Sequence, residues 1–275
     1  MEEYAYLVNK AKQLRIDVAK MTTKAGIGHV TSSYSCAEMM TALYYGNILK
    51  YKQEDPNWKD RDFFILSKGH ANPILYCILI DLGFISKVEM ERFCSINGKL
   101  GVLLRGDLPG TEITSGSLGC GLGIAAGIAQ GLKMDNKKNK VVCMLGDAEC
   151  REGAIWEAAM HIGAMQMDNI LVIVDCNNLG ATHFLNKEAS IGDIVAKWQA
   201  FGFKVESING HDFSEIIPAL LRTEKEDKPS VIIANTIKGK GVSFLENQVF
   251  LHGVAIKQEK LEEAIQEIRE GRKKV

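Results

Sequence analysis

The sequence lacks the features that mark membrane, secreted and nucleic-acid-binding proteins. No apolar run approaches the roughly 20 residues of a membrane-spanning helix, and the first residues, MEEYAYLVNKAKQLRIDVAK, form a charged amphipathic segment unlike a signal peptide. The 33 Lys and Arg residues almost cancel the 34 Asp and Glu residues, which leaves a net charge of −1. We therefore expect a globular protein with no membrane partner and no general affinity for nucleic acid.

Paired cysteines are also absent. The seven cysteines are scattered along the chain, and none stands in a Cys-x-x-Cys pair. This pattern argues against a zinc site and favours a reducing, cytoplasmic location. The chain contains no internal repeats and no low-complexity segment.

Short apolar, β-branched runs alternate with helical patterns along the 275 residues. We predict strands over 63–66, 141–145, 170–174, 203–206 and 230–234, and helices between them. The pattern predicts an α/β fold, a doubly wound parallel sheet flanked by helices. The chain is interpreted as one domain over 1–275, with an N-terminal helix over 3–24 and a solvated Lys/Glu-rich helical tail from Lys257.

The stretch from Gly146 to Asn178 reads as the end of a strand, a helix, a second strand and a loop. A right-handed crossover would bring Asp147 and Asn177 to the carboxyl edge of the same sheet, where open α/β sheets bind ligands. A carboxylate, an amide oxygen and loop carbonyls suit Mg²⁺ or Ca²⁺ carrying a phosphate. The alternative is that Asp147 caps the next helix and Asn177 is a turn residue.

Four glycines open a helix of small residues, at positions 116, 119, 121 and 123. They would either let the backbone approach an anionic ligand at the helix N-terminus or allow close helix packing. Three histidines in glycine-flanked loops, His29, His70 and His252, are candidates for contacting phosphate or moving protons.

Other polar residues receive structural interpretations. We expect His161 to be packed on a helix and His211 to be a turn residue, whereas His183 lies close enough in sequence to approach the metal loop. Ser35 would cap the following helix, with Glu38 as its capping-box partner.

Several motifs of the sequence resemble those of a known family. Gly146-Asp147-Ala148-Glu149 stands thirty positions before Asn177 (177 − 147 = 30) and resembles the thiamine diphosphate motif. Further blocks resemble transketolase segments in the same order, over about residues 10 to 255: GHVTSSYSCAEMM, FFILSKGHA, TEITSGSLGCGLGIAAG, AKWQAFGF, INGHD, TIKGKGVSF and LHG. The chain is most similar to the separately encoded N-terminal subunit of split transketolases.

The resemblance implies a cofactor, a metal and roles for individual residues. Asp147, Asn177 and the Leu179 carbonyl would hold Mg²⁺ (or Ca²⁺ or Mn²⁺), which would hold the diphosphate of thiamine diphosphate. His29 would face the sugar substrate, and Glu152 would link paired active sites across a dimer. The implied catalytic residues are His29, His70, His252 and Glu152, and the implied cofactor-binding residues are His70, Gly116, Ser117, Leu118, Gly146, Asp147, Ala148, Glu149, Asn177 and His252.

The resemblance also implies a partner. In the family, the glutamate that activates the cofactor ring lies in a following pyrimidine-binding domain, which we do not expect within these 275 residues. We therefore expect half an active site, completed by a C-terminal transketolase-like subunit in an α2β2 assembly. Such an enzyme transfers a two-carbon ketol unit from a ketose to an aldose.

Three departures from the family pattern leave alternatives open. Ala148 replaces a glycine, Val30-Thr31-Ser32 replaces Pro-Gly-Gly, and Val102 stands where a donor-binding histidine is usual if Gly101 is aligned. An apolar residue cannot hydrogen-bond the hydroxyl at C1 of the donor. The donor would then be a modified or 1-deoxy ketose, or an α-keto acid used by an acyl-transferring or decarboxylating enzyme. A catalytically silent scaffolding subunit is the third interpretation.

Overall fold

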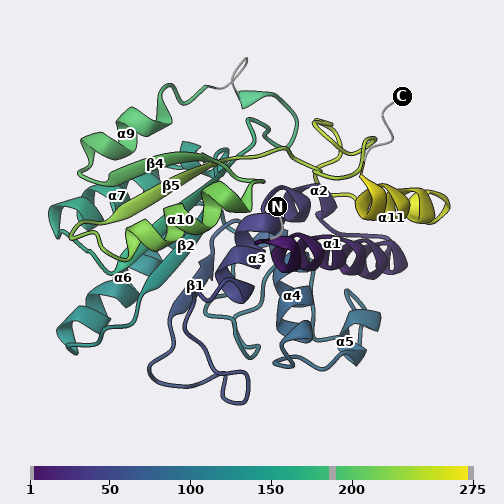
Figure 1. The fold of residues 1–275 in the computed structure, drawn as a ribbon, viewed down its shortest axis with the longest axis horizontal. Coiled ribbons are helices and arrows are strands. Elements are labelled where there is room, and N and C mark those ends of the chain that lie inside the picture. Colours follow the sequence, from purple (N-terminus) through teal and green to yellow (C-terminus); the bar gives the residue numbers. More distant parts are fainter. Residues whose placement is uncertain (1–2, 186–189, 272–275) are drawn as a thin grey trace.

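The computed structural model describes residues 3–185 and 190–271, and its centre is a five-stranded parallel sheet (Figure 1). The strand order is β1-β2-β3-β5-β4, and each neighbouring pair is parallel. The strands are β1 (Phe63–Leu66), β2 (Val141–Gly146), β3 (Ile170–Cys176), β4 (Lys204–Asn209) and β5 (Ser230–Asn235). The predicted α/β fold with a parallel sheet is confirmed.

The inner strands are buried on both faces, which explains their continuous apolar sequences. All residues of β2 before Gly146 and of β3 before Cys176 are buried. The predicted β1 bounds are confirmed, whereas β4 begins one residue later than predicted and runs to Asn209. Phe203 is instead a packing residue, with its ring 4.9 Å from that of Trp198.

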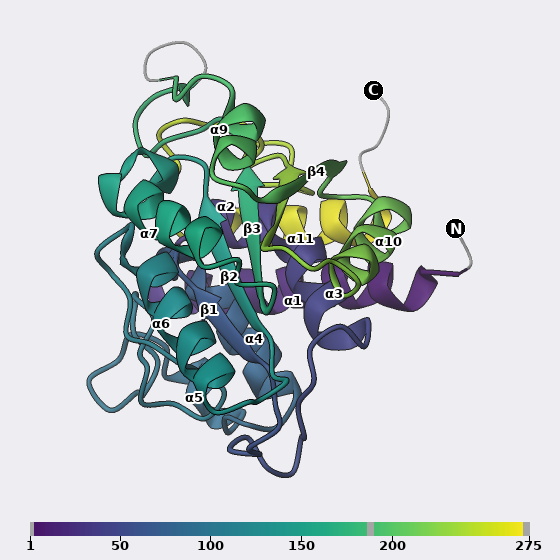
Figure 2. The ribbon, with the colours of Figure 1, turned by 90° about the vertical axis from the view of Figure 1, so that its left-hand side faces the viewer.

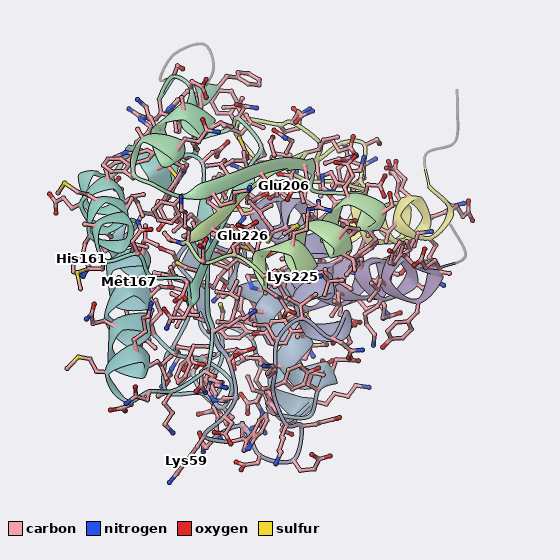
Figure 3. The ribbon with its side chains drawn as sticks, turned by 60° about the vertical axis from the view of Figure 1, so that its left-hand side comes forward. Lys59, His161, Met167, Glu206, Lys225 and Glu226 are labelled. Carbon is pink, nitrogen blue, oxygen red and sulfur yellow. The ribbon has the colours of Figure 1, made fainter. Side chains whose placement is uncertain are left out.

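One face of the sheet is covered by α6 (Cys120–Met134), α7 (Gly153–Ala164) and α9 (Ile194–Ala200), as Figure 2 shows. Their small and aromatic residues form one hydrophobic cluster with the strands. Helix α6 begins at Cys120, directly after Gly119, whose φ of 91° ends the preceding loop, so the last two of the four glycines lie inside the helix. His161 on α7 is exposed, so the expectation that it is packed was wrong (Figure 3).

The opposite face carries the larger cluster. It involves α1 (Ala5–Ala25), α2 (Val30–Ser35), α3 (Ala37–Tyr45), α4 (Asn72–Asp81), α10 (Phe213–Thr223) and α11 (Leu261–Glu270), while α5 (Val88–Glu91) lies beside α1. Helix α11 is solvated on one side only. Ala264, Ile265 and Ile268 are buried, and α11 packs along α1. The predicted tail is therefore part of the hydrophobic core.

Short helical turns follow two strands at the carboxyl edge of the sheet: η1 (Gly69–Ala71) after β1 and η2 (Glu149–Arg151) after β2. A third, η3 (Gln258–Lys260), precedes α11. The loops after β3 and β5 begin at the same edge, because Gly146 at the end of β2 pairs with Asp175 and Cys176 at the end of β3 pairs with Asn235. The topology therefore gathers four loops with polar residues at one place.

Candidate functional site

Asp147 joins the loops that follow β2 and β3. One carboxylate oxygen accepts a hydrogen bond from the Ala148 amide at 2.7 Å, and the other accepts one from the Asn178 amide at 2.5 Å. Its side chain is 4% exposed. The carboxylate therefore binds adjacent backbone across two strands and does not cap α7, whose N-cap is Glu152.

Asn177 forms the tight turn that begins the loop after β3. Its amide oxygen accepts from the Leu179 amide at 3.1 Å, and its amide nitrogen lies 3.4 Å from both the Ser35 hydroxyl and the Asp175 carboxylate. The turn interpretation is thus confirmed for its local geometry. Because an amide oxygen has two lone pairs, the turn leaves acceptor capacity for a ligand.

A second buried carboxylate, Asp175, lies at the end of β3 and is fully neutralised. It forms an ion pair with Lys68 and accepts hydrogen bonds from the hydroxyls of Ser35 and Thr236. Burial alone would raise the pKa of Asp175, but Lys68 and these donors hold it below its usual value. Lys68 also donates to the Ser32 carbonyl at 3.1 Å and ties the turn after β1 to the loop before α2.

Asp147 differs from Asp175 because no described residue forms an ion pair with it. Burial, together with the nearby charge of Asp175, raises the pKa of Asp147 to about 6. A bound cation would remove this penalty. Among the described residues, no group of three His, Cys, Asp or Glu side chains could hold a metal. A divalent ion here would therefore need amide and carbonyl oxygens, and Asn177 and the Leu179 carbonyl fit that requirement.

The three loop histidines singled out from the sequence lie next to one another in the structure. The rings of His29 and His70 have centroids 5.2 Å apart, those of His29 and His252 are 5.2 Å apart, and those of His70 and His252 are 4.9 Å apart. Burial lowers the pKa of all three, to about 4 for His252. The imidazoles are neutral near pH 7. The Nδ1 atom of His29 is buried without a hydrogen-bond partner in the structure.

Lys238 is a cation at this edge that the sequence reasoning did not single out. Its ammonium donates to the Gly180 carbonyl at 2.9 Å and lies 3.0 Å from Nδ1 of His252. The residue is 2% exposed, and burial together with Lys68 lowers its pKa to about 8. The one sequence signal for Lys238 was its position in the TIKGKG block, which resembles a transketolase segment. Lys238 gives the cluster a fixed positive charge that suits an anionic ligand.

The glycines before and within the first turn of α6 serve different purposes. A side chain at Gly121 would collide with Ser67, at 2.3 Å from its hydroxyl, and one at Gly119 would lie 2.7 Å from Cβ of Glu152. These two glycines therefore serve close packing, whereas nothing lies within 4 Å of a side chain placed at Gly123. Gly116 and Ser117 are exposed and Leu118 is half-buried, so this segment remains accessible to a ligand.

Glu149 has a structural arrangement. Its carboxylate, in a residue that is 1% exposed, accepts from the Ser67 hydroxyl, from the Gly119 amide at 2.9 Å and from the Gly146 amide at 3.1 Å. It thereby fixes three loops around Asp147. Glu152 is exposed at the start of α7, where it could meet another chain. A cofactor contact by Glu149 stays a prediction.

Ala148 causes no strain in the motif. Its φ of −63° and ψ of −34° are ordinary helical values, so glycine is not required there. In the loop after α5, Val102 is half-buried, and the side chain of Leu103 approaches Gly116. The Gly101 carbonyl accepts from Asn72, next to the turn that carries His70. The apolar loop therefore borders the Gly116 segment.

The structure also tests the predictions for Ser35 and His183. Ser35 does not cap α3, since its hydroxyl lies on Asp175 and the N-cap residue Cys36 has no side-chain cap. His183 contacts Arg151 at 3.1 Å, and the Gly180 amide donates to its carbonyl. It therefore lies in the loop that contains Leu179.

Comparison with known proteins places this geometry in a family. The family model "Transketolase, thiamine diphosphate binding domain" matches residues 5–271. The SqwG subunit of 6-deoxy-6-sulfo-D-fructose transketolase from Clostridium sp. (strain MSTE9) is 34% identical, with 97% of this chain and 98% of that protein covered. One of the subunits of apulose-4-phosphate transketolase from Actinobacillus succinogenes is also 34% identical, with 97% of each chain covered.

Longer relatives match over part of their length. Human transketolase is 35% identical over 95% of this chain, which spans 42% of that protein. The crystal structure of transketolase from Campylobacter jejuni matches with a TM-score of 0.91 and 31% identity, covering 96% of this chain and 42% of that one. No described helix has the length and apolar character needed to cross a membrane. The chain belongs to the transketolase family and comprises its thiamine diphosphate binding domain.

Proposed function

We propose that this chain is the diphosphate- and metal-binding subunit of a two-component transketolase. It would transfer a two-carbon ketol unit from a ketose to an aldose, as a single domain that works with a C-terminal, pyrimidine-binding subunit in an α2β2 assembly. The observation that carries this proposal is the buried, unpaired Asp147 beside a cluster of neutral histidines and Lys238. The two subunit relatives of similar length support the two-chain organisation.

Different residues would hold the metal, the diphosphate and the remainder of the cofactor. Asp147, Asn177 and the Leu179 carbonyl would hold Mg²⁺, and the metal together with His70, His252 and Lys238 would hold the diphosphate. The exposed segment Gly116–Leu118 would contact the cofactor, which supplies a carbanion for cleaving and forming carbon–carbon bonds when bound. Because their pKa values are lowered, the histidines would donate hydrogen bonds to phosphate or substrate without carrying charge.

His29 is the residue of this chain that we place against the substrate. Its ring completes the histidine triangle, and its buried Nδ1 has no partner in the structure. A substrate hydroxyl would satisfy that atom. Glu152, exposed at the start of α7, is proposed to contact its counterpart across the assembly. The seven free cysteines agree with a cytoplasmic enzyme.

The donor is proposed to be a modified ketose. Apolar Val102 and Leu103 border the site where the family resemblance expects a histidine that binds the C1 hydroxyl. A 1-deoxy ketose or another altered sugar would not need that hydrogen bond. The two subunit relatives are named for unusual sugars, 6-deoxy-6-sulfo-D-fructose and apulose 4-phosphate, which supports a modified ketose as the donor here.

Reconstitution tests both proposals. The purified chain should be inactive alone and should gain thiamine diphosphate-dependent transfer when mixed with a pyrimidine-binding transketolase subunit encoded beside it. Turnover by the single chain would contradict the half-site proposal. Full activity with xylulose 5-phosphate and ribose 5-phosphate would contradict the proposed donor while leaving the two-component enzyme intact.

A further inference from the structure

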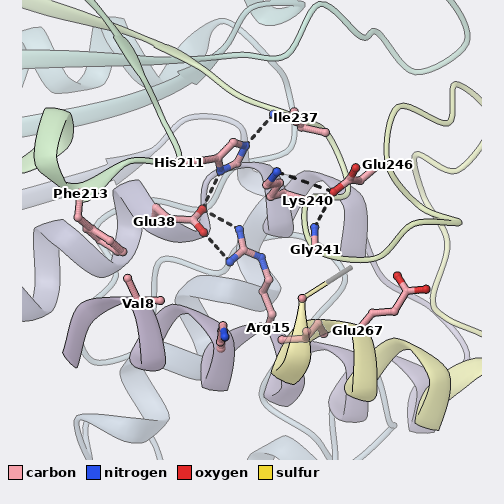
Figure 4. Close-up of a pocket in the computed structure, with 13 residues that line it drawn as sticks. Val8, Arg15, Glu38, His211, Phe213, Ile237, Lys240, Gly241, Glu246 and Glu267 are labelled. Carbon is pink, nitrogen blue, oxygen red and sulfur yellow. Dashed lines mark hydrogen bonds and ion pairs between the residues drawn. The ribbon is translucent and has the colours of Figure 1, made fainter. Parts of the chain in front are cut away.

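A cavity of about 370 Å³ lies away from the histidine cluster, between α1, α11 and the loops after β4 and β5 (Figure 4). This volume falls within the range of small-molecule sites, about 300 to 1,000 Å³. It is bordered by residues that the cofactor site does not use, among them Lys12, Arg15, His211 and Lys240. His211 is a turn residue, as expected, and its side chain also borders this cavity.

The floor of the cavity is a rigid network of paired groups. Arg15 forms a bidentate interaction with Glu38, with both N–O distances 2.7 Å, and Nδ1 of His211 donates to Glu38 at 2.9 Å. Nε2 of His211 accepts from the Ile237 amide at 2.8 Å, which fixes the tautomer. Figure 4 shows the bonds from Arg15 and His211 converging on Glu38, and the bond from Ile237 ending on His211. The floor is therefore preformed and has no charge left to neutralise.

The rim has spare cationic donors, whereas its carboxylates are bound. Glu267 accepts from the amide and hydroxyl of Ser243, and Glu246 accepts from the Gly241 amide. By contrast, Lys12 donates one hydrogen bond, to the Arg269 carbonyl at 3.0 Å. Each ammonium has three N–H groups, so capacity remains for a ligand.

Lys240 is the second rim cation. Lys240 forms an ion pair with Glu246 (Figure 4), but its distance of 4.0 Å is too long for a hydrogen bond, so the N–H groups of Lys240 can still donate to a ligand. The lining residues Lys12, Arg15 and Lys240 balance Glu38, Glu246 and Glu267 in formal charge. This balance favours a ligand with one negative charge over a doubly charged phosphate.

The walls between floor and rim are apolar. They include Val8, Phe213, Ile237 and Ile268. Val8 is 41% exposed although it faces this cavity, and Ile268 is 4% exposed. A ligand that covered these side chains would gain from the removal of apolar surface from water.

We propose that this cavity is a second ligand site, which binds a small organic monocarboxylate with an aliphatic or aromatic body. The carboxylate lies between Lys12 and Lys240, and the body lies against Val8, Phe213 and Ile268.

The same loop connects this cavity to the cofactor edge. Ile237, Lys240 and Gly241 line the cavity, while between them Lys238 reaches Gly180 and His252. The preceding residue, Thr236, bonds Asp175. A carboxylate that orders Lys240 therefore also restrains the segment that presents Lys238. This coupling rests on the proposed function, but the ligand site does not.

Hexanoate is a suitable probe, with 1-hexanol and inorganic phosphate as matched comparisons. We expect ligand-detected NMR on the full chain to show saturable, millimolar hexanoate binding and weaker binding of the other two. Lys240→Gln should weaken hexanoate binding about tenfold, and Val8→Trp, which fills the cavity from the surface of α1, should abolish it. Lys20→Gln, at an exposed position of α1, is the control.

Three results would overturn the site: no saturable hexanoate binding, equal binding by Lys240→Gln and Lys20→Gln, or binding retained by Val8→Trp. Phosphate that binds as tightly as hexanoate would overturn the ligand class. For the coupling, saturating hexanoate should change thiamine diphosphate affinity of the reconstituted complex severalfold. An unchanged affinity would contradict the coupling alone, and absence of any cofactor binding would instead contradict the proposed function.

Discussion

Two buried carboxylates, Glu38 on α3 and Asp147 after β2, have opposite surroundings. Glu38 is 8% exposed and contacts Arg15 and His211. Burial would raise its pKa, but these partners lower the pKa to about 2. Asp147 is 4% exposed, accepts hydrogen bonds from two backbone amides, has no ion pair among the described residues, and its pKa is raised to about 6. Both side chains are buried, yet the charge of Glu38 stabilises the fold, whereas the charge of Asp147 destabilises it unless a ligand compensates for it.

Asp175, close to Asp147, shows that a buried carboxylate in this region can be compensated. Asp175 pairs with Gly146 in the sheet, forms an ion pair with Lys68, and accepts hydrogen bonds from two hydroxyls. The protein therefore pairs one of two adjacent carboxylates with a lysine, whereas the other has no ion pair among the described residues.

Lys68→Met should remove about 3 to 5 kcal/mol from the free energy of unfolding, because it leaves Asp175 buried and uncompensated. Urea unfolding of the purified chain measures the loss. Lys133→Met, which breaks the exposed pair with Asp168, is the matched control and should cost at most about 1 kcal/mol. The double variant Lys68→Met/Asp175→Asn should recover much of the stability. A loss equal to that of the control would contradict the proposed pairing.

The two contrasted carboxylates should give stability effects of opposite sign at pH 7. Asp147 has a raised pKa, so its penalty appears as pH rises from about 3.8 to about 6. Asp147→Asn should therefore be more stable than wild type by about 1 to 3 kcal/mol at pH 7, and the two should converge below about pH 4.

Glu38 has a lowered pKa, so its contribution is present above about 4.5 and is lost as pH falls towards about 2. Glu38→Gln should accordingly be less stable than wild type at pH 7, and the difference should shrink in acid. Thermal unfolding of both variants across pH 3 to 7 provides the test, over the window given by these pKa shifts. The same sign for both variants at neutral pH would refute the contrast.

Ala148→Gly should have the smallest effect. Because Ala148 already has helical dihedral angles, glycine gains no strain relief and only adds freedom to the unfolded chain. We expect a loss of less than about 1 kcal/mol and an unchanged affinity for thiamine diphosphate, measured by denaturation and calorimetry. A large gain in cofactor affinity would mean that alanine impairs the motif.

The sequence predicted the features that depend on local pattern. The parallel strands followed from apolar runs, and His29, His70 and His252 were singled out because each lies in a glycine-flanked loop. Asp147 was identified because it ends one strand of a strand–helix–strand unit. Such inferences need only the order of elements and the rule that parallel strands end at one edge.

Features that depend on pairing in space could not be predicted. Lys68 and Asp175 are 107 positions apart, and nothing in their local sequence announces the ion pair. Ser35 resembled a helix cap because Glu38 follows three residues later, yet tertiary partners take both side chains. The packing role of Gly121 likewise depends on Ser67 of another element.

The most direct test of the unpaired carboxylate is calorimetric titration of thiamine diphosphate into the two-chain complex, with and without Mg²⁺, for wild type and Asp147→Asn. We expect wild-type binding to require the metal, and the variant to lose more than about 100-fold in affinity, since even residues behind metal ligands cost 10- to 100-fold. Equal affinity and equal metal dependence in both proteins would contradict the account.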